Sequence, residues 1–263
     1  MSTRDVDPAA GSGPGAPRSA TAARQTKGMV TMRLCVFGAN GPTGRLVTGQ
    51  ALDEGHRVTA FTRHPADFPL EHPRLRVAGG DVADPDAVTD AVDGQDAVLS
   101  VLGVPYSKDP ITVYSVGAEH VTAAMHRTGV DRLVAVTSSV VEPNPNRVGG
   151  FLFERVLQPY VVNKLGRTLY DDMRRCEAII RNSGLDWTVV RPSGLFTAPA
   201  VSRYTVAPGH GIGRFTARVD LADCLLRELG EGGHHRQAVA VLTTEGTPSL
   251  ASMMWREAVA SKH

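Results

Sequence analysis

Glycines that follow a short apolar stretch constrain the fold of this chain more than any other feature. The stretch ends at Phe37, and Gly38, Gly41 and Gly44 follow at intervals of three residues. A buried strand that ends in a turn without Cβ atoms lets the backbone approach a pyrophosphate, and the next helix points its unpaired N–H groups at that group. The spacing is Gly-x-x-Gly-x-x-Gly, and between a strand and a helix it predicts a dinucleotide site.

The segments around these glycines alternate between strand and helix patterns. A strand at 33–37, a helix at 43–54 and a strand at 56–63 form the first crossover unit. We expect further strands at 75–81, 96–103, 132–139, 187–191 and 238–242, and helices at 84–92, 111–128, 168–182 and 219–229. This alternation predicts a single-domain α/β Rossmann fold, which is a doubly wound parallel sheet with helices on both faces.

The first 31 residues differ in composition from the rest of the chain. They are rich in Ala, Gly, Pro, Ser and Thr and lack the apolar stretch of a signal peptide. Such a segment buries too little apolar surface to offset the entropy lost on ordering. We expect residues 1–31 to be a disordered extension and 32–263 to be an NAD(P)-binding Rossmann domain with its substrate pocket in the C-terminal part.

The net charge and the cysteine content limit which classes of partner and ligand we expect. A formal net charge of +1 gives no electrostatic reason for binding nucleic acid or a membrane. Cys35, Cys176 and Cys224 are far apart, and no metal-ligand spacing occurs. We therefore expect a cytoplasmic protein that is a monomer or weak homodimer, binds a small-molecule substrate and holds no metal.

The residues after the second strand indicate which cofactor binds. Chains that bind NAD usually carry an Asp or Glu about 20 residues past the glycines, and its carboxylate accepts a hydrogen bond from the ribose 2′-hydroxyl. This chain has Thr62 and Arg63 there, and a guanidinium binds a 2′-phosphate through paired charge-assisted hydrogen bonds. We predict NADPH (NADP) as the cofactor. The alternative is that Arg63 is a solvated loop cation. Arg45, directly after the glycines, either makes a second phosphate contact or is a solvated arginine on the helix surface.

Several further stretches match one family in order along the chain. They are Gly38-Ala-Asn-Gly-Pro-Thr-Gly44, Gly80-Asp-Val82, Gly94-Gln-Asp-Ala-Val98, Leu102-Gly103, Gly129-Val-Asp-Arg-Leu-Val-Ala-Val-Thr-Ser138, Asp171-Asp172, Ser183-Gly-Leu185 and Tyr204-Thr-Val206. From 34 to about 242 the chain resembles the atypical short-chain dehydrogenase/reductases with an NAD(P)H-binding, NmrA-like domain. Within them it is most similar to the biliverdin reductase B branch of NADPH-dependent flavin reductases.

The resemblance implies roles for individual residues. Thr137 and Ser138, which end the fifth strand, would be catalytic and face the nicotinamide; as an alternative they only cap the strand end. Asp81 would accept from the adenine amino group, or serve as a turn residue. The implied cofactor-binding residues are Gly38, Asn40, Gly41, Pro42, Thr43, Gly44, Thr62, Arg63, Asp81, Val82, Leu102, Gly103 and Pro192. The implied substrate-pocket residues are Ser139, Ser193 and Leu195.

The function implied is an NADPH-dependent oxidoreductase that transfers a hydride to a planar acceptor such as a flavin or quinone. Segments 143–160 and 195–204 would form lids over the acceptor. Histidines of the flavin reductase branch are replaced by Met173 and Glu177, so a histidine-dependent step is not expected. One alternative is an NmrA-like NADP(H)-binding regulator without turnover. Another is a ketone reductase or isomerase that uses Tyr160 and Lys164, although the family register places that pair at Leu169 and Met173.

Overall fold

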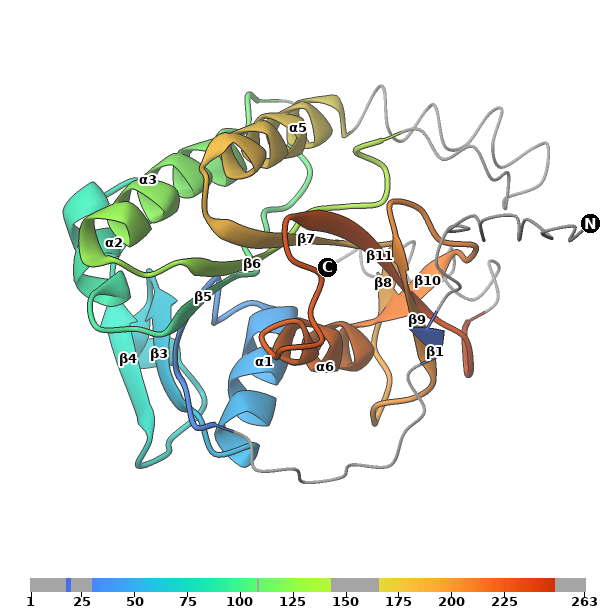
Figure 1. Ribbon diagram of the computed structural model, residues 1–263, viewed down its shortest axis with the longest axis horizontal. Helices are drawn as coiled ribbons and strands as arrows, with labels where there is room; N and C mark the ends of the chain where they lie inside the picture. Colours follow the sequence, from blue (N-terminus) through green and yellow to red (C-terminus); the bar gives the residue numbers. More distant parts are fainter. Residues whose placement is uncertain (1–17, 20–29, 108, 143–165, 249–263) are drawn as a thin grey trace, which may run out of the picture.

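A nine-stranded sheet organises the chain, with strand order β1-β9-β11-β7-β6-β5-β2-β3-β4 (Figure 1). The computed structural model describes residues 18–19, 30–107, 109–142 and 166–248. The strands of this sheet are β1 (Arg18–Ser19), β2 (Arg33–Phe37), β3 (Arg57–Thr62), β4 (Leu75–Gly79), β5 (Ala97–Ser100), β6 (Arg132–Val136), β7 (Asp186–Pro192), β9 (Tyr204–Pro208) and β11 (Gln237–Thr243). β8 (Gly194–Phe196) and β10 (Phe215–Ala217) form a separate parallel pair.

Five α-helices in the described residues cover the two faces of the sheet. They are α1 (Pro42–Asp53), α2 (Pro85–Val92), α3 (Val113–Thr128), α5 (Arg167–Asn182) and α6 (Arg218–Arg227). In Figure 1, α2, α3 and α5 lie above the sheet and α1 and α6 below it. The strand residues alternate accordingly: Leu133 belongs to the apolar cluster on the first side and Val134 to the cluster on the second. The predicted doubly wound fold is confirmed.

The strand order reverses between β2 and β5. β2 pairs with β3 on one side and with β5 on the other, all in parallel. Open α/β sheets bind ligands beyond the carboxyl ends of the strands at such a reversal. The glycines that follow β2 therefore lie at the position where this fold forms a ligand crevice.

The region between β7 and α6 is more structured than the sequence predicts. β8, β9 and β10 lie there, and β8 begins one residue before the segment 195–204 that we predict as a lid and extends into it. β9 runs antiparallel to β11, which explains why an alternating parallel pattern does not reveal it. Other boundaries differ by a few residues; β6 ends at Val136, although the Ser139 amide still donates to the Pro192 carbonyl (3.0 Å).

The N-terminal segment contributes a single element among the described residues. Arg18 and Ser19 pair antiparallel with Val206 and Thr205 of β9. Residues 1–17 and 20–29 lie outside the described residues, so the disorder expected there stays a prediction. No helix in the described ranges is long and apolar enough to cross a membrane.

Candidate functional site

Two of the three glycines are required by close backbone packing. Gly38 has φ +77°, and a Cβ there would lie 2.6 Å from the Val101 carbonyl oxygen. A Cβ on Gly44 would lie 2.2 Å from the Gly38 carbonyl oxygen and 2.7 Å from the Ala39 Cα. The turn after β2 is thus pressed against the exit of β5 and the start of α1. Only glycine allows this approach, which is what a pyrophosphate-binding turn needs.

The first turn of α1 is arranged to receive an anion. Gly41 is the N-cap residue, Pro42 follows it, and no side chain among the described residues caps the helix. The first helical hydrogen bond runs from the Arg45 amide to the Gly41 carbonyl (3.0 Å), which leaves the Thr43 and Gly44 amides at the positive end of the helix dipole. Arg45 Nε donates to Asn40 Oδ1 (3.0 Å), so a guanidinium is held beside the turn. These residues fit a dinucleotide pyrophosphate.

Arg63 lies at the same edge of the sheet as this turn. Phe61 and Phe37 are partners in the β2–β3 ladder, so the residues just after each strand are neighbours at the carboxyl edge. Thr62 is buried, and its Oγ1 accepts from the His64 amide (3.2 Å). The Arg63 side chain is exposed at this edge, and its contact with a ribose phosphate stays a prediction.

Asp81 and Val82 follow β4, and Leu102 and Gly103 follow β5 at the same edge. Asp81 Oδ1 accepts from the Ala83 amide (2.9 Å), which is the turn role that the sequence left open for this residue. Val82 is buried and its carbonyl contacts His120 Nδ1 (2.7 Å). Gly103 is exposed, and a Cβ there would meet nothing within 4 Å. Room for a ligand therefore lies beside Gly103.

The three hydroxyls after β6 have different surroundings. Thr137 is buried, and its hydroxyl donates to Glu177 Oε1 (2.7 Å). Ser138 is half-buried, and its Oγ accepts from the Val140 amide (3.3 Å). Ser139 Oγ accepts from Ser193 Oγ (3.1 Å) at the end of β7. The Thr137 proton is thus held by a carboxylate, whereas Ser138 and Ser139 line the open edge.

A buried ion cluster contacts one of these hydroxyls, because Glu177, which accepts from Thr137, belongs to it. The sequence analysis does not predict this cluster. Arg191 in β7 is 1% exposed. Its Nε donates to Glu177 Oε1 (2.9 Å) and its Nη1 to Glu142 Oε2 (2.5 Å). Burial would lower the pKa of Arg191, but its hydrogen bonds to Glu177 and Glu142, with the charges of these two carboxylates, outweigh burial and raise the pKa. The bond to Arg191 lowers the pKa of Glu142. A single signal was available in the sequence: an arginine inside an apolar strand needs a buried acid.

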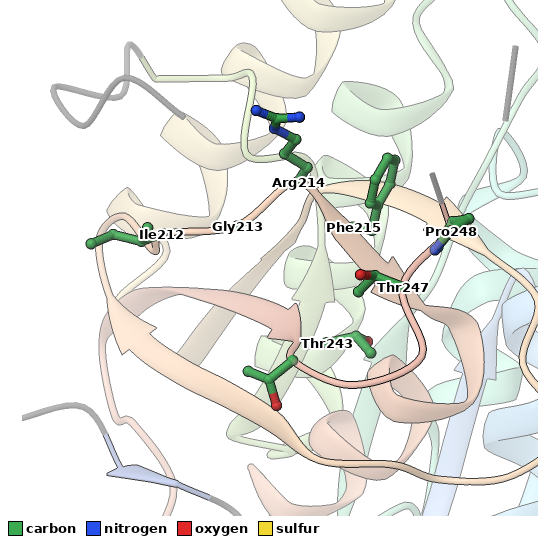
Figure 2. Close-up of a pocket in the computed structure, with 8 residues that line it drawn as sticks. Ile212, Gly213, Arg214, Phe215, Thr243, Thr247 and Pro248 are labelled. Carbon is green, nitrogen blue, oxygen red and sulfur yellow. The ribbon is translucent and has the colours of Figure 1, made fainter. Parts of the chain in front are cut away.

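A pocket of about 520 Å³ opens next to these strand ends (Figure 2). It is lined by Ile212, Gly213, Arg214, Phe215, Thr243, Thr244, Thr247 and Pro248. None of the predicted substrate-pocket residues Ser139, Ser193 and Leu195 lines this pocket. The Ser193 amide donates to Thr216 Oγ1 (3.0 Å) and Leu195 pairs with Thr216, the residue after the lining residue Phe215. Leu46 of α1 packs against the small apolar cluster that also contacts Phe215. The pocket therefore lies in the C-terminal part of the domain, beside β10 and the end of β11.

Some predicted features lie outside the described residues. They include Tyr160, Lys164 and the whole of the segment 143–160, so the roles of these residues stay predictions. At the two positions where the family register places a Tyr and a Lys, Leu169 and Met173 are buried apolar side chains. No group of metal-ligating side chains occurs in the part of the chain that the structure describes.

Comparison with known proteins identifies the family of this chain. A family model described as NAD(P)H-binding matches residues 38–231, and the chain belongs to this NAD(P)H-binding family. An uncharacterized chloroplastic protein of Arabidopsis thaliana is 28% identical over 206 residues, which are 73% of this chain and 71% of that protein. The resemblance predicted from the motifs is confirmed at the level of this family.

Two further proteins are similar to this chain, one a reductase in sequence and the other a solved structure in fold. A (4-alkanoyl-5-oxo-2,5-dihydrofuran-3-yl)methyl phosphate reductase of Streptomyces griseus is 29% identical over 159 residues, 60% of this chain and 46% of that protein. A short-chain dehydrogenase/reductase of Veillonella parvula, solved in complex with NADP, has a TM-score of 0.69 and 18% identity over 84% of this chain and 100% of that one. At that identity the likeness concerns the fold.

Proposed function

We propose that this protein is an NADPH-dependent oxidoreductase that transfers a hydride to a planar acceptor, a flavin or a quinone. The observation that carries the proposal is the arrangement of one edge of the sheet. The glycine turn, Gly103, the serines after β6 and the pocket beside β10 all lie beyond the carboxyl ends of the parallel strands. A reductase among the relatives and an NADP complex among the similar structures support the same class.

The residues divide into a cofactor part and an acceptor part. When bound, NADPH supplies a hydride from its nicotinamide ring. The Thr43 and Gly44 amides would hold the pyrophosphate. Asp81, Val82, Leu102 and Gly103 would line the adenosine side, and Pro192 would contact the carboxamide. Ser138 would face the reacting rings, with Thr137 supporting it from the buried side, and Ser139, Ser193 and Leu195 would border the acceptor.

Arg63 carries the preference for NADPH over NADH. We expect Arg63→Ala to weaken NADPH binding about 10-fold or more while NADH binding changes little, because a charge-assisted pair to the 2′-phosphate is lost. Titration calorimetry with both cofactors measures the ratio. Arg57→Ala is the matched control, since Arg57 is an exposed arginine at the opposite end of the same strand. An unchanged ratio of the two affinities in Arg63→Ala would contradict the preference.

An NmrA-like regulator without turnover is the second candidate. The buried Leu169 and Met173 favour it, because neither can move a proton at the positions where the family register expects a Tyr and a Lys. NADPH consumption with riboflavin, FMN and a simple quinone, with NADH as the cofactor control, separates the two functions. Turnover establishes a reductase, and tight binding without turnover establishes the regulator. The cytoplasmic location and the monomer or weak homodimer stay predictions.

A further inference from the structure

Two tyrosines from different elements join their hydroxyls at the open edge of the sheet. Tyr106 lies in the loop after β5 and is 57% exposed, whereas Tyr170 lies in α5 and is 7% exposed. The two hydroxyl oxygens are 3.0 Å apart. The rings meet edge to face, with centroids 6.4 Å apart, an arrangement that aromatic pairs favour. One phenol is thus fixed by the core, and the other reaches solvent.

The surrounding residues hold this pair in place. Thr168 Oγ1 donates to the Ser107 carbonyl (3.2 Å), which ties the loop to the first turn of α5. Gly166 precedes that helix, and a Cβ there would lie 2.6 Å from the Tyr170 ring and 3.1 Å from the Tyr106 ring. A glycine at this position lets both rings pack against the start of the helix. The pair is therefore part of the fold, and the loop does not bring it together by chance.

Burial distinguishes the two phenols. Burial, and next the hydrogen bond with Tyr106, raise the pKa of Tyr170, so that its hydroxyl keeps its proton. Tyr106 is the exposed partner, and either hydroxyl can donate in the contact between them. When Tyr170 donates to the Tyr106 oxygen, the Tyr106 proton is free to bind a group on the solvent side.

The pair lies at the edge used by the proposed reaction. Tyr106 comes three residues after Gly103, and α5 begins at the carboxyl edge, above the strands that end near Ser138 (Figure 1). Tyr106 is one of the four large hydrophobic side chains that are exposed in the described residues; neither Tyr106 nor Tyr170 lines the pocket beside β10. Exposed apolar surface at a ligand edge suits a flat apolar acceptor.

We propose that Tyr106 is the proton donor of this site, that Tyr170 is its positioning residue, and that the acceptor is a conjugated carbonyl compound of the quinone class. The proposal rests on the proposed reductase function. The hydride adds to the acceptor, the electron pair of the carbonyl π bond moves onto oxygen, and the Tyr106 O–H bond breaks as its proton binds that oxygen. The acceptor gains two electrons and two hydrogens, with oxidation of NADPH to NADP+, and the exposed Tyr106 phenolate takes a proton from water.

Three phenylalanine variants test this assignment, with menadione as the quinone probe. Tyr204→Phe is the comparison variant, because Tyr204 is buried and its hydroxyl donates to Asp223 of α6 and contacts neither Tyr106 nor Tyr170. The first readout is the Kd of menadione for the protein loaded with NADP+, where no turnover occurs. The second is kcat with NADPH, and the third is the Kd of NADP+ itself.

We expect Tyr106→Phe to raise the menadione Kd about 3- to 10-fold and to lower kcat about 10-fold or more, with the NADP+ Kd unchanged. Tyr170→Phe should lower kcat several-fold without changing the KM of NADPH, a split that general loosening of the fold would not produce. Tyr204→Phe should change none of these constants. Wild-type kcat and menadione Kd in Tyr106→Phe would overturn the assignment. A wild-type protein that binds NADP(H) and reduces no acceptor would instead overturn the reductase function.

Discussion

Gly44 and Gly49 lie in the same helix, and their surroundings are opposite. A Cβ on Gly44 would meet the Gly38 carbonyl oxygen at 2.2 Å, whereas a Cβ on Gly49 would meet nothing within 4 Å. Gly44 is therefore kept by close packing of α1 on the turn after β2. Gly49 carries only the entropic cost of a glycine in a helix interior.

This difference predicts opposite effects of one added methyl group. Gly44→Ala should destabilise the fold by about 2 kcal/mol or more, because backbone atoms must move, and should weaken NADP+ binding as the turn shifts. Gly49→Ala should stabilise it by roughly 0.5–1 kcal/mol. Urea unfolding of both variants measures the free energies. A Gly44→Ala protein as stable as the parent would show that the turn is looser than described.

At the scale of elements, α5 supplies the N-terminal cap of α3. Thr112 precedes α3, and its own side chain does not cap the helix. Asp172 of α5, which is fully buried, accepts from the Tyr114 amide (2.8 Å) and the Ser115 amide (3.3 Å). A carboxylate at a helix N-terminus satisfies unpaired donors and matches the dipole. The two helices are thus joined by a polar contact within their apolar interface.

The neighbouring aspartates of α5 give a matched test of this cap. Asp172→Asn should lower the free energy of unfolding by about 1–3 kcal/mol, because a buried charge-assisted acceptor is weakened. Asp171→Asn should change it by less than about 0.5 kcal/mol, since Asp171 is about half exposed and pairs with Arg174 on the surface. Thermal or chemical unfolding compares the two. Equal effects would mean that Asp172 does not act as the cap.

The elements also show how far the sequence predicts this fold. The parallel strands and their helices are legible because apolar periodicity and glycine stops agree at each. β8 and β10 have three residues each and are too short to show periodicity. Only the structure reveals them, through the contact between Phe196 of β8 and Phe215 of β10. The glycine turn is predicted because its spacing is local. The Thr137–Glu177–Arg191 contacts are not, because they join residues up to 40 positions apart and many acids could have paired with Arg191.

At the scale of the whole molecule, one buried histidine links stability to pH. His56 Nδ1 accepts from the Met32 amide (3.1 Å), which joins the start of the domain to the start of β3. Burial lowers the pKa of His56; Glu54 opposes this shift and Arg74 adds to it. Because the folded pKa lies below the unfolded value of about 6.5, the unfolded chain takes up a proton first as pH falls. The stability contribution of His56 is therefore present above that pH and lost below it.

His56→Asn should remove this component, because the Asn Oδ1 can accept from the Met32 amide and does not titrate. Between about pH 7 and 5 we expect the parent to lose stability more steeply than the variant, by at most about 1.4 kcal/mol per pH unit, the limit for one proton. Urea unfolding across this range gives both slopes. Parallel slopes would show that His56 protonation is not coupled to unfolding.

The contact between Arg191 and Glu142 sets a condition for building chimeras of this family. Glu142 is the last described residue before the segment that leads to α5, and its carboxylate contacts a guanidinium that the core excludes from water. Exchange of residues 143–165 with those of a relative, to transfer acceptor specificity, must therefore keep an acid at position 142. A graft that begins one residue earlier and brings an apolar side chain would leave half of a buried guanidinium without its partner. Such a chimera would fail by unfolding, and its inactivity would say nothing about the acceptor.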